Sequence, residues 1–402
     1  MRERKLVPKK RFKGFEKNWD VITLEETSQK VGDGLHGTPK YDDSGSVYFI
    51  NGNNIFNGKI NFYKDTKTVT KYEQSSNDLL LDTHTILISV NGTIGNLAFY
   101  NGEEIMLGKS VAFIILKKNE KQYIFYYLQT PNVYNYFLNN LTGSTIKNLG
   151  LKQIKETKVA LPVIKEQQKI GEFFKVLDER IANQERKIAK VKALKAAYLT
   201  EMFPQEGETV PKRRFKGFEG EWHKKMLGDF GTVEMNKRIF KEQTSIIGDV
   251  PFYKIGTFGK QADAFISYEL FNEYKTKYPY PNPGDILISA AGSIGRTIEY
   301  QGEDAYYQDS NIVWLKHDGK LSNLFLKQFY KFTNWSSLEG STIKRLYNRD
   351  ILEAIIHVPS SIKEQQKIGA FFKNLDNQIE TEEKKLDKLQ KMKEGYLEEM
   401  FV

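Results

Sequence analysis

The chain has 402 residues, no cysteine and a formal net charge of +9. The lack of cysteine excludes disulfide bonds and thiolate metal sites, and it fits a reducing compartment. No stretch is apolar enough to serve as a signal peptide or a membrane span, so we expect a soluble cytoplasmic protein. A chain of this length predicts two to four domains.

The positive charge is unevenly distributed. Residues 20–164 carry 14 basic and 14 acidic side chains, and residues 223–362 carry 17 and 16. The excess therefore lies in the first 19 residues and in the segment that follows residue 164. Net charge alone is weak evidence for nucleic-acid binding here, because only a basic face gathered in space would indicate it.

One stretch occurs twice with few changes: KEQQKIGEFFKVLDERI at 165–181 and KEQQKIGAFFKNLDNQI at 363–379. Each copy opens a proline-free pattern that ends in Tyr-Leu-x-Glu-Met-Phe, at 198–203 and 396–401. Apolar residues recur at alternating three- and four-residue spacing, which predicts a long helix with a narrow apolar stripe. About 39 residues at a rise of roughly 1.5 Å give a rod of about 58 Å.

A narrow apolar stripe on so long a helix needs a partner. We predict that the two copies pair within one molecule as an antiparallel coiled coil, because two similar halves favour a twofold-like arrangement. Packing of each helix on its own domain, or pairing between molecules, is the alternative. The predicted coiled-coil seam consists of Phe174, Leu177, Ile181, Ile188, Val191, Tyr198, Phe372, Leu375, Ile379, Leu386, Leu389 and Tyr396. Its polar positions are Gln184, Lys195, Glu382 and Lys393.

A short basic arm also occurs twice, at 8–15 (PKKRFKGF) and at 211–218 (PKRRFKGF), each followed by a tryptophan. Either the aromatic residues anchor the arm to a domain while its basic residues stay solvated, or the arm follows a polyanion. The repeats divide the chain into a first recognition domain (1–163), a first spacer helix (164–203), a second recognition domain (204–361) and a second spacer helix (362–402).

Between the repeated motifs lie two similar mixed α/β modules, so the fold class is α+β with a pseudo-twofold internal repeat. Strands are predicted near Val47–Ile50, Thr85–Val90, Leu97–Tyr100 and Val111–Leu116, and a helix over Tyr123–Leu141 that breaks near Pro131. The two modules share several motifs, but residues 30–75 and 235–280 share almost nothing. A common scaffold with one variable section is typical of modules that bind different ligands in one manner; even drift after duplication is the alternative.

We find no catalytic motif in the sequence. It lacks the Asn-Pro-Pro-aromatic motif of amino-methyltransferases and a Walker A sequence. The run GDGLHG at 32–37 has Gly-x-Gly-x-x-Gly spacing, but we interpret this Gly-rich segment as a turn rather than a cofactor loop. Its five histidines lack metal-ligand spacing. The sequence therefore favours binding over catalysis.

Polar and basic residues in the predicted strand-end loops suit nucleic acid. The Gly-Ser-Thr-Ile-Lys segments offer N–H groups, hydroxyls and a cation for a phosphate, and amide and arginine side chains can read adenine and guanine. Each residue taken singly could equally be a solvated turn former. The DNA-binding candidates are His36, Thr38, Lys40, Asn53, Asn91, Thr93, Lys109, Ser110, Ser144, Thr145, Lys147, Lys237, Arg238, Lys254, Ser293, Arg296, Gln308, Ser310, Asn311, Ser341, Thr342, Lys344 and Arg345.

Two tandem units, each a variable module followed by a KEQQKIGxFF helix that ends in YLxEMF, resemble the specificity subunit of type I restriction–modification systems. The resemblance covers essentially the whole chain. It implies two target-recognition domains, each reading one half of a bipartite, asymmetric site in double-stranded DNA. It also implies an antiparallel coiled coil that sets the gap between the half-sites, and a chain that is not itself an enzyme.

The resemblance further implies partners. Two modification subunits would bind S-adenosylmethionine and methylate adenine at N6, and two restriction subunits would use ATP and Mg²⁺, so we expect no cofactor or metal on this chain. The alternatives are a non-catalytic coiled-coil scaffold with two protein-binding modules, and a self-sufficient nuclease or methyltransferase with an unrecognised site.

Overall fold

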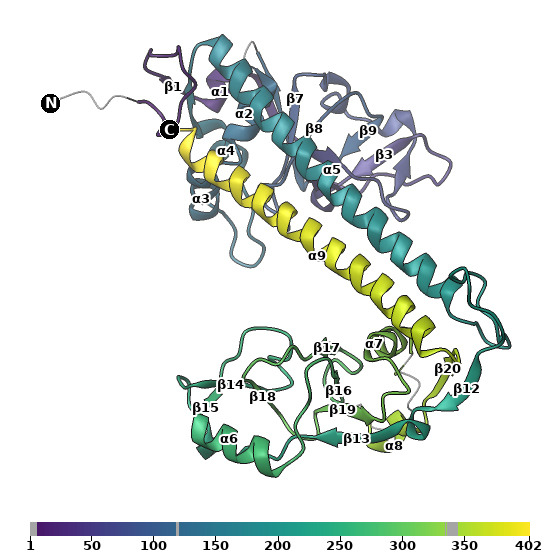
Figure 1. Ribbon diagram of the computed structural model, residues 1–402. Helices are drawn as coiled ribbons and strands as arrows, with labels where there is room; N and C mark the ends of the chain where they lie inside the picture. Colours follow the sequence, from purple (N-terminus) through teal and green to yellow (C-terminus); the bar gives the residue numbers. More distant parts are fainter. Residues whose placement is uncertain (1–5, 118–119, 334, 336–344) are drawn as a thin grey trace. The chain divides into compact units, whose positions relative to one another are not determined.

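The computed structural model describes residues 6–117, 120–333, 335 and 345–402 (Figure 1). The chain forms two compact units: unit 1 comprises Met1–Glu185 and Lys384–Val402, and unit 2 comprises Arg186–Glu383. Two long helices, α5 (Ile164–Met202) and α9 (Ile362–Glu399), contribute to both. Each unit therefore contains one globular module together with half of each long helix. Within the described residues, none of the helices is both long and apolar enough to span a lipid bilayer.

The module of unit 1 is built on a four-stranded sheet in the order β2-β10-β7-β8. All residues of β7 and β10 are buried, as expected from their apolar sequences TILIS and VAFIIL. A smaller sheet, β6-β3-β9, contains a parallel β3–β9 pair. The strands are β1 (Asp20–Thr23), β2 (Ser28–Asp33), β3 (Val47–Ile50), β4 (Ile55–Phe56), β5 (Lys59–Ile60), β6 (Thr68–Val69), β7 (Thr85–Ser89), β8 (Leu97–Phe99), β9 (Ile105–Leu107), β10 (Val111–Leu116) and β11 (Lys158–Leu161).

The two faces of the main sheet pack against different elements because side chains alternate along a strand. Ile86 and Ile114 share a core with the helices, whereas Leu87 and Phe113 pack towards the smaller sheet. The four strands predicted from sequence are confirmed, and the predicted helix does break at Pro131, the first residue of α3. The helices are α1 (Leu24–Thr27), α2 (Lys121–Tyr127), α3 (Pro131–Asn139) and α4 (Leu151–Glu156), with 3₁₀ turns η1 (Gly52–Asn54), η2 (Lys71–Glu73) and η3 (Asp78–Leu80).

The module of unit 2 has the same plan. Its main sheet has the order β13-β19-β16-β17, and its small sheet, β15-β14-β18, again contains a parallel pair. The difference lies in the variable section, where α6 stands in place of η2 and η3. The elements are β12 (His223–Met226), η4 (Leu227–Asp229), β13 (Gly231–Met235), η5 (Lys241–Gln243), β14 (Val250–Tyr253), β15 (Phe265–Ile266), α6 (Tyr268–Lys277), β16 (Ile286–Ser289), β17 (Thr297–Glu299), β18 (Tyr306–Tyr307), β19 (Ile312–His317), α7 (Asn323–Phe332), α8 (Asn348–Leu352) and β20 (Ile355–Val358).

Within each unit, α5 and α9 pair in an antiparallel manner. In unit 2, Lys187 of α5 pairs with Glu382 of α9 at 2.8 Å, and Tyr198, further along α5, packs edge-on against Phe371, earlier on α9. As the residue number increases along α5, the number of its contact on α9 decreases, which confirms the predicted antiparallel orientation. Six seam residues are buried (Phe174, Leu177, Ile188, Val191, Phe372 and Leu375), and six are half-buried (Ile181, Tyr198, Ile379, Leu386, Leu389 and Tyr396).

The long helices also pack on the modules. In unit 1 the Phe174 ring stacks on Tyr126 of α2, with ring centroids 5.1 Å apart, and on Phe401 near the end of α9, at 5.5 Å. In unit 2 the Phe203 ring stacks in the same way on Phe325 of α7. Helix pairing and packing on the local domain, which were alternatives at the level of sequence, therefore occur together.

The basic arm of unit 1 joins the start of one long helix to the end of the other. Arg11 donates from Nε and Nη2 to the two carboxylate oxygens of Glu166, at 2.7 and 2.8 Å, and the Glu166 side chain is completely buried. The neighbouring Lys10 donates its backbone N–H to the Glu399 carbonyl at 2.8 Å. Trp19 is buried in the core. These contacts favour the anchoring interpretation of the arm.

The arm of unit 2 repeats this clasp. Arg214 makes the same two-pronged contact with Glu364, at 2.7 and 2.8 Å, and the Arg213 N–H donates to the Glu201 carbonyl at 2.8 Å. The basic arm and the KEQQ motif thus recur together because an arginine of one is paired with the glutamate of the other.

Besides Glu382, which pairs with Lys187, two further polar residues of the predicted seam pair across the helices. In unit 2, Lys195 of α5 pairs with Asp376 of α9, and Lys331 of α7 donates to the same carboxylate at 2.9 Å. In unit 1, Lys393 of α9 pairs with Asp178 of α5 at 2.8 Å. Each pair satisfies charges that burial between helices would otherwise penalise.

Replacing Arg11 with alanine should leave the buried Glu166 carboxylate without its partner. We expect a loss of about 3–5 kcal/mol in the free energy of unfolding of unit 1, measured by urea denaturation. Lys10→Ala, in the same arm, removes an exposed ion pair and serves as the matched control, with little expected effect. Equal losses in the two variants would contradict a structural role for the buried pair.

The Asp376 carboxylate should give unit 2 a stability that depends on pH. Burial opposes its charge, but the hydrogen bonds from Lys195 and Lys331 outweigh burial and hold the pKa of Asp376 below its usual value. Such a group stabilises the fold above its unfolded pKa of about 3.9 and loses this effect as the pH falls through the folded value. We expect Asp376→Asn to cost about 1.5–3 kcal/mol at neutral pH, and the difference from the parent to shrink below about pH 4.

Urea denaturation over a pH series measures this difference. Asp387→Asn, which removes an exposed carboxylate from the same helix, is the control and should change stability little at any pH. A pH-independent difference for Asp376→Asn would show that its carboxylate does not contribute in this way.

Candidate nucleic-acid interface

Loops that are far apart in the sequence meet in the module of unit 1. Leu35 and Gly108 form a backbone bridge between the loops after β2 and β9. The Gly52 N–H donates to Ser110 Oγ at 2.8 Å, and Ser110 Oγ donates to Asn51 Oδ1 at 2.9 Å. These bonds hold the loops after β2, β3 and β9 together.

Two further loops join them. Thr93, in the loop after β7, donates its hydroxyl to the Gly52 carbonyl at 3.0 Å. Asn91 forms a bridge with Asn148, and Asn148 closes a tight hairpin with Thr142 through two backbone hydrogen bonds of 2.9 Å. The hairpin thereby lies beside the loop after β7 and carries the exposed candidates Ser144, Thr145 and Lys147.

The same loops meet in unit 2 through a corresponding backbone bridge but through different side-chain bonds. Ala291, after β16, bridges with Arg345, and the Arg345 Nη2 donates to the Ser310 carbonyl at 2.9 Å. Gln308 Oε1 accepts the Ile255 N–H at 2.9 Å, which ties the loop after β14 to the loop after β18. Both modules therefore bring most of the sequence-predicted residues to corresponding loop clusters.

Several side chains that the sequence predicts to bind DNA are paired with other groups of the protein. Three basic candidates pair with a carboxylate: His36 with Asp33 at 2.6 Å, Arg238 with Asp309 at 2.9 Å and Lys254 with Asp263 at 2.9 Å. The candidates that remain exposed include Thr38, Lys40, Asn53, Lys109, Lys237, Ser293 and Arg296, whereas Asn91, Ser110, Gln308, Ser310, Asn311 and Arg345 are half-buried. Ser341, Thr342 and Lys344 lie outside the described residues.

Each variable section has a hollow beside its central strand. The hollow of unit 2 has a volume of about 500 Å³, and its walls include Phe252 of β14, Lys254 and Gln308. The smaller hollow of unit 1, of about 100 Å³, is lined by Phe49 of β3 and by Asn51. Asn51 was not predicted as a site residue, although the run Asn51-Gly-Asn-Asn54 offered the same amide signal as the chosen Asn53.

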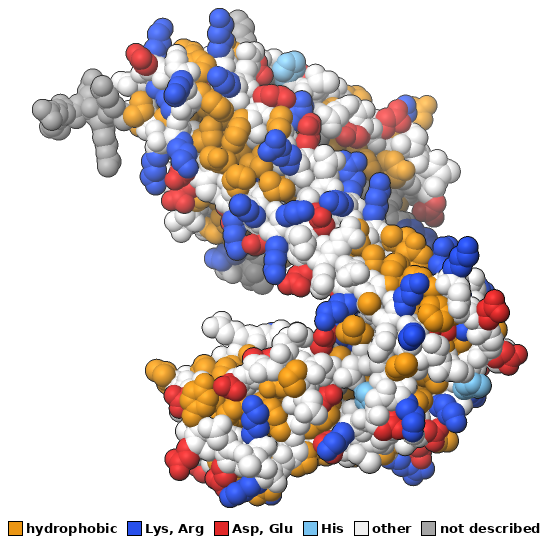
Figure 2. Space-filling view, in the orientation of Figure 1, with side chains coloured by type: hydrophobic (Ala, Val, Ile, Leu, Met, Phe, Trp, Pro, Cys, Tyr) orange, Lys and Arg blue, Asp and Glu red, His pale blue; other side chains and the backbone are white. Residues whose placement is uncertain are grey.

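Basic residues do not form one continuous patch on the visible face of either unit. Figure 2 shows Lys and Arg side chains interspersed with acidic and hydrophobic ones. This agrees with the near-neutral charge of both modules. Among the described residues there is also no cluster of three or more His, Asp or Glu side chains able to hold a metal ion.

A family model for the type I restriction modification DNA specificity domain matches residues 16–193 and 219–391. The two matches cover most of the chain and fall on its two repeated halves. The chain belongs to this family. Two specificity domains in tandem account for the paired modules and for the repeated helix motif.

Curated relatives carry corresponding names. A Haemophilus influenzae protein named as a type I restriction enzyme specificity subunit, S.HindORF215P, is 55% identical over 157 residues, which are 38% of this chain and 40% of that protein. The match thus spans less than half of that relative. A Methanocaldococcus jannaschii protein named as the type I restriction enzyme MjaX specificity subunit is 21% identical over 94% of this chain and 91% of its own length.

Solved structures of the family share the fold. The type I restriction-modification S subunit from M. genitalium matches with a TM-score of 0.66 and 18% identity, over 98% of this chain and 99% of that one. A chain from a structural study of complex assembly and conformational transition in the type I R-M system matches with a TM-score of 0.56 and 16% identity, over 96% and 98%. At these identities the likeness concerns the fold.

Ser110 should hold the loops after β3 and β9 of the first specificity domain together. Ser110→Ala removes the acceptor of the buried Gly52 N–H, which costs about 1–3 kcal/mol locally. We expect faster amide hydrogen exchange over residues 51–54. Ser310→Ala is the matched control, since Ser310 binds Arg345 through its backbone carbonyl and should leave exchange in unit 2 unchanged. Unchanged exchange in Ser110→Ala would show that other contacts suffice.

Proposed function

We propose that this chain selects the DNA sequence on which a type I restriction–modification enzyme acts. The observation that carries the proposal is the pair of specificity domains with one scaffold and two different sets of loops. In both modules most of the described sequence-predicted residues lie in loops at the ends of corresponding strands, yet the side-chain bonds that hold these loops differ. Each module would read one half of a bipartite, asymmetric site.

The long helices would then set the separation of the two half-sites. At a rise of about 1.5 Å per residue, α5 and α9, with 39 and 38 residues, are each roughly 58 Å long. Half-sites one helical turn of DNA apart are separated by about 34–36 Å, so helices of this length are on the required scale. The Arg–Glu clasps and the Lys–Asp pairs support this role, because they tie each module to both helices.

The chemistry would be supplied by partner subunits. Two modification subunits with S-adenosylmethionine would methylate adenine at N6, and two restriction subunits with ATP and Mg²⁺ would cleave unmethylated DNA. The chain itself would be non-catalytic. The family resemblance supports this division, and the near-neutral modules suggest that partners contribute to the grip on phosphates.

Exchange of a module tests the proposal directly. Residues 21–161 would be replaced by the corresponding module of another such chain, and the chain would be expressed with its modification subunit. Methylome sequencing should show a bipartite motif for the parent and a change in only one half of it for the chimera. An unchanged host methylome with the parent would instead support a protein-binding scaffold, and methyl transfer by the purified chain alone would support a self-sufficient enzyme.

A further inference from the structure

The loop before β14 in unit 2 presents two uncovered isoleucines. Ile246 is 84% and Ile247 82% exposed. Loop tips usually hold Gly, Asn, Asp, Ser or Pro, because these residues suit the backbone of a turn and remain hydrated. Two large aliphatic side chains in this loop depart from the usual composition of turns, and such departures are expected at functional positions.

The backbone of this loop is tightly held. Ser245 and Phe265 exchange two backbone hydrogen bonds of 2.9 Å, and Pro251, beyond the loop, pairs with the same Phe265. A Cβ atom at Gly248 would lie 2.7 Å from the Phe265 Cβ, so the loop closes only with glycine there. The isoleucines are therefore displayed from a defined position at the edge of the small sheet.

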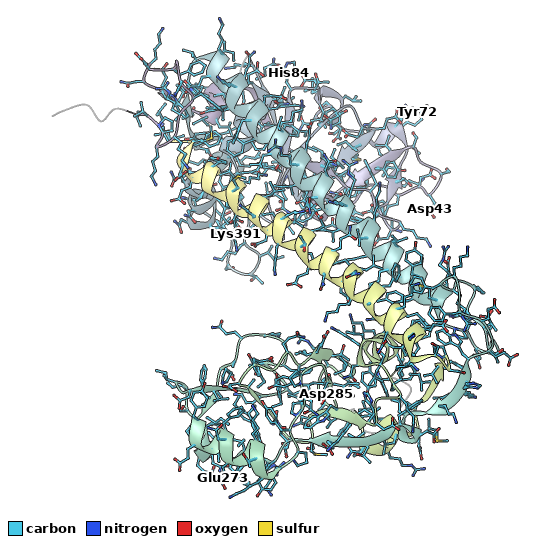
Figure 3. All side chains as sticks on the ribbon, viewed as in Figure 1. Asp43, Tyr72, His84, Glu273, Asp285 and Lys391 are labelled. Atoms are coloured by element: carbon cyan, nitrogen blue, oxygen red, sulfur yellow. The ribbon has the colours of Figure 1, made fainter. Side chains whose placement is uncertain are left out.

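The matching loop of unit 1 carries opposite chemistry. Residues 42–46 form this loop, and the residues on either side of it, Tyr41 and Val47, both pair with Val69 of the neighbouring strand. Their sequence is Asp-Asp-Ser-Gly-Ser, and the Ser44 N–H donates to Asp42 Oδ1 at 2.8 Å, as in an ordinary turn. Asp43 of this loop is labelled in Figure 3. One scaffold position thus holds two carboxylates in one module and two aliphatic side chains in the other, as expected of a position that contacts different ligands.

Ile246 also borders the hollow of unit 2. Lys254 and Gln308, two sequence-predicted DNA contacts, line the same hollow, and so does Lys241. Lys254 is paired with Asp263, which also lines the hollow, so Lys241 is the lysine that would favour approach to phosphates here. Among the base edges in the major groove, the C5-methyl of thymine is the group that an aliphatic side chain can recognise.

We propose that Ile246 and Ile247 are specificity-determining residues that read thymine by packing against its C5-methyl in the half-site of unit 2. This inference rests on the proposed function. In both modules, the loop before the central strand of the small sheet would contact the bases. Because this loop differs between the modules, it would contribute to the difference between the two half-sites.

Uracil substitution tests the contact, since it removes the methyl and leaves base pairing intact. The chain in complex with its modification subunit would be titrated with duplexes of its own motif, with each thymine of the second half-site replaced in turn by uracil. We expect at least one replacement to weaken binding about fourfold, the worth of one buried methyl. The double variant Ile246→Ala/Ile247→Ala should bind the thymine duplex more weakly and no longer respond to uracil.

Two controls accompany the titration. Ile246→Val/Ile247→Val keeps branched aliphatic side chains and should retain the uracil response, and all variants should melt like the parent because the substituted side chains are exposed. A parent that reads the bipartite motif but tolerates uracil throughout the second half-site would overturn this inference alone. The inference would also be overturned if the alanine double variant responded to uracil like the parent. It would be overturned as well if that variant no longer bound the modification subunit. A parent without any bipartite preference would overturn the proposed function itself.

Discussion

The antiparallel pairing of α5 with α9 is the constraint on which each unit depends. Neither module completes its core alone: in unit 1 the side chains of Tyr123, Tyr126 and Phe174 close around Phe401 from the end of the other long helix. The KEQQKIGxFF start and the YLxEMF end must therefore fit each other in both units. This explains why both motifs are retained in both copies while the variable sections have diverged.

Buried ionic contacts give that pairing its direction. A carboxylate as deeply buried as Glu166 or Glu364 is costly unless both oxygens are satisfied, and an arginine held in the same plane meets this need with two bonds. The bonds would be lost if the helix start met any other segment. Apolar seam residues supply most of the burial, whereas the polar contacts discriminate between arrangements that would bury similar area.

The two modules show how much a shared scaffold tolerates. In unit 1, Phe99 of β8 stacks on Phe125 of α2 with ring centroids 3.9 Å apart. In unit 2 the sheet is joined there to two helices by ion pairs, from Glu299 of β17 to Lys327 of α7 and Lys373 of α9. The loop clusters likewise use Ser110 in one module and Arg345 in the other. The two modules thus share one fold but present different surfaces. Recognition of two different sequences requires this combination.

The sequence by itself determined the twofold repeat, the four strands around β7 and β10, the helix break at Pro131 and the two long amphipathic helices. These features depend on periodicity and on proline geometry, which are local properties of the chain. Only the tertiary structure decided that Arg11 belongs to Glu166, 155 residues away, and that Arg238 and Lys254 are paired with acidic neighbours. It also brought Asn51 beside Ser110 and left Ile246 uncovered. Such contacts join segments that the topology brings together, and no local pattern records which charge or loop will face which.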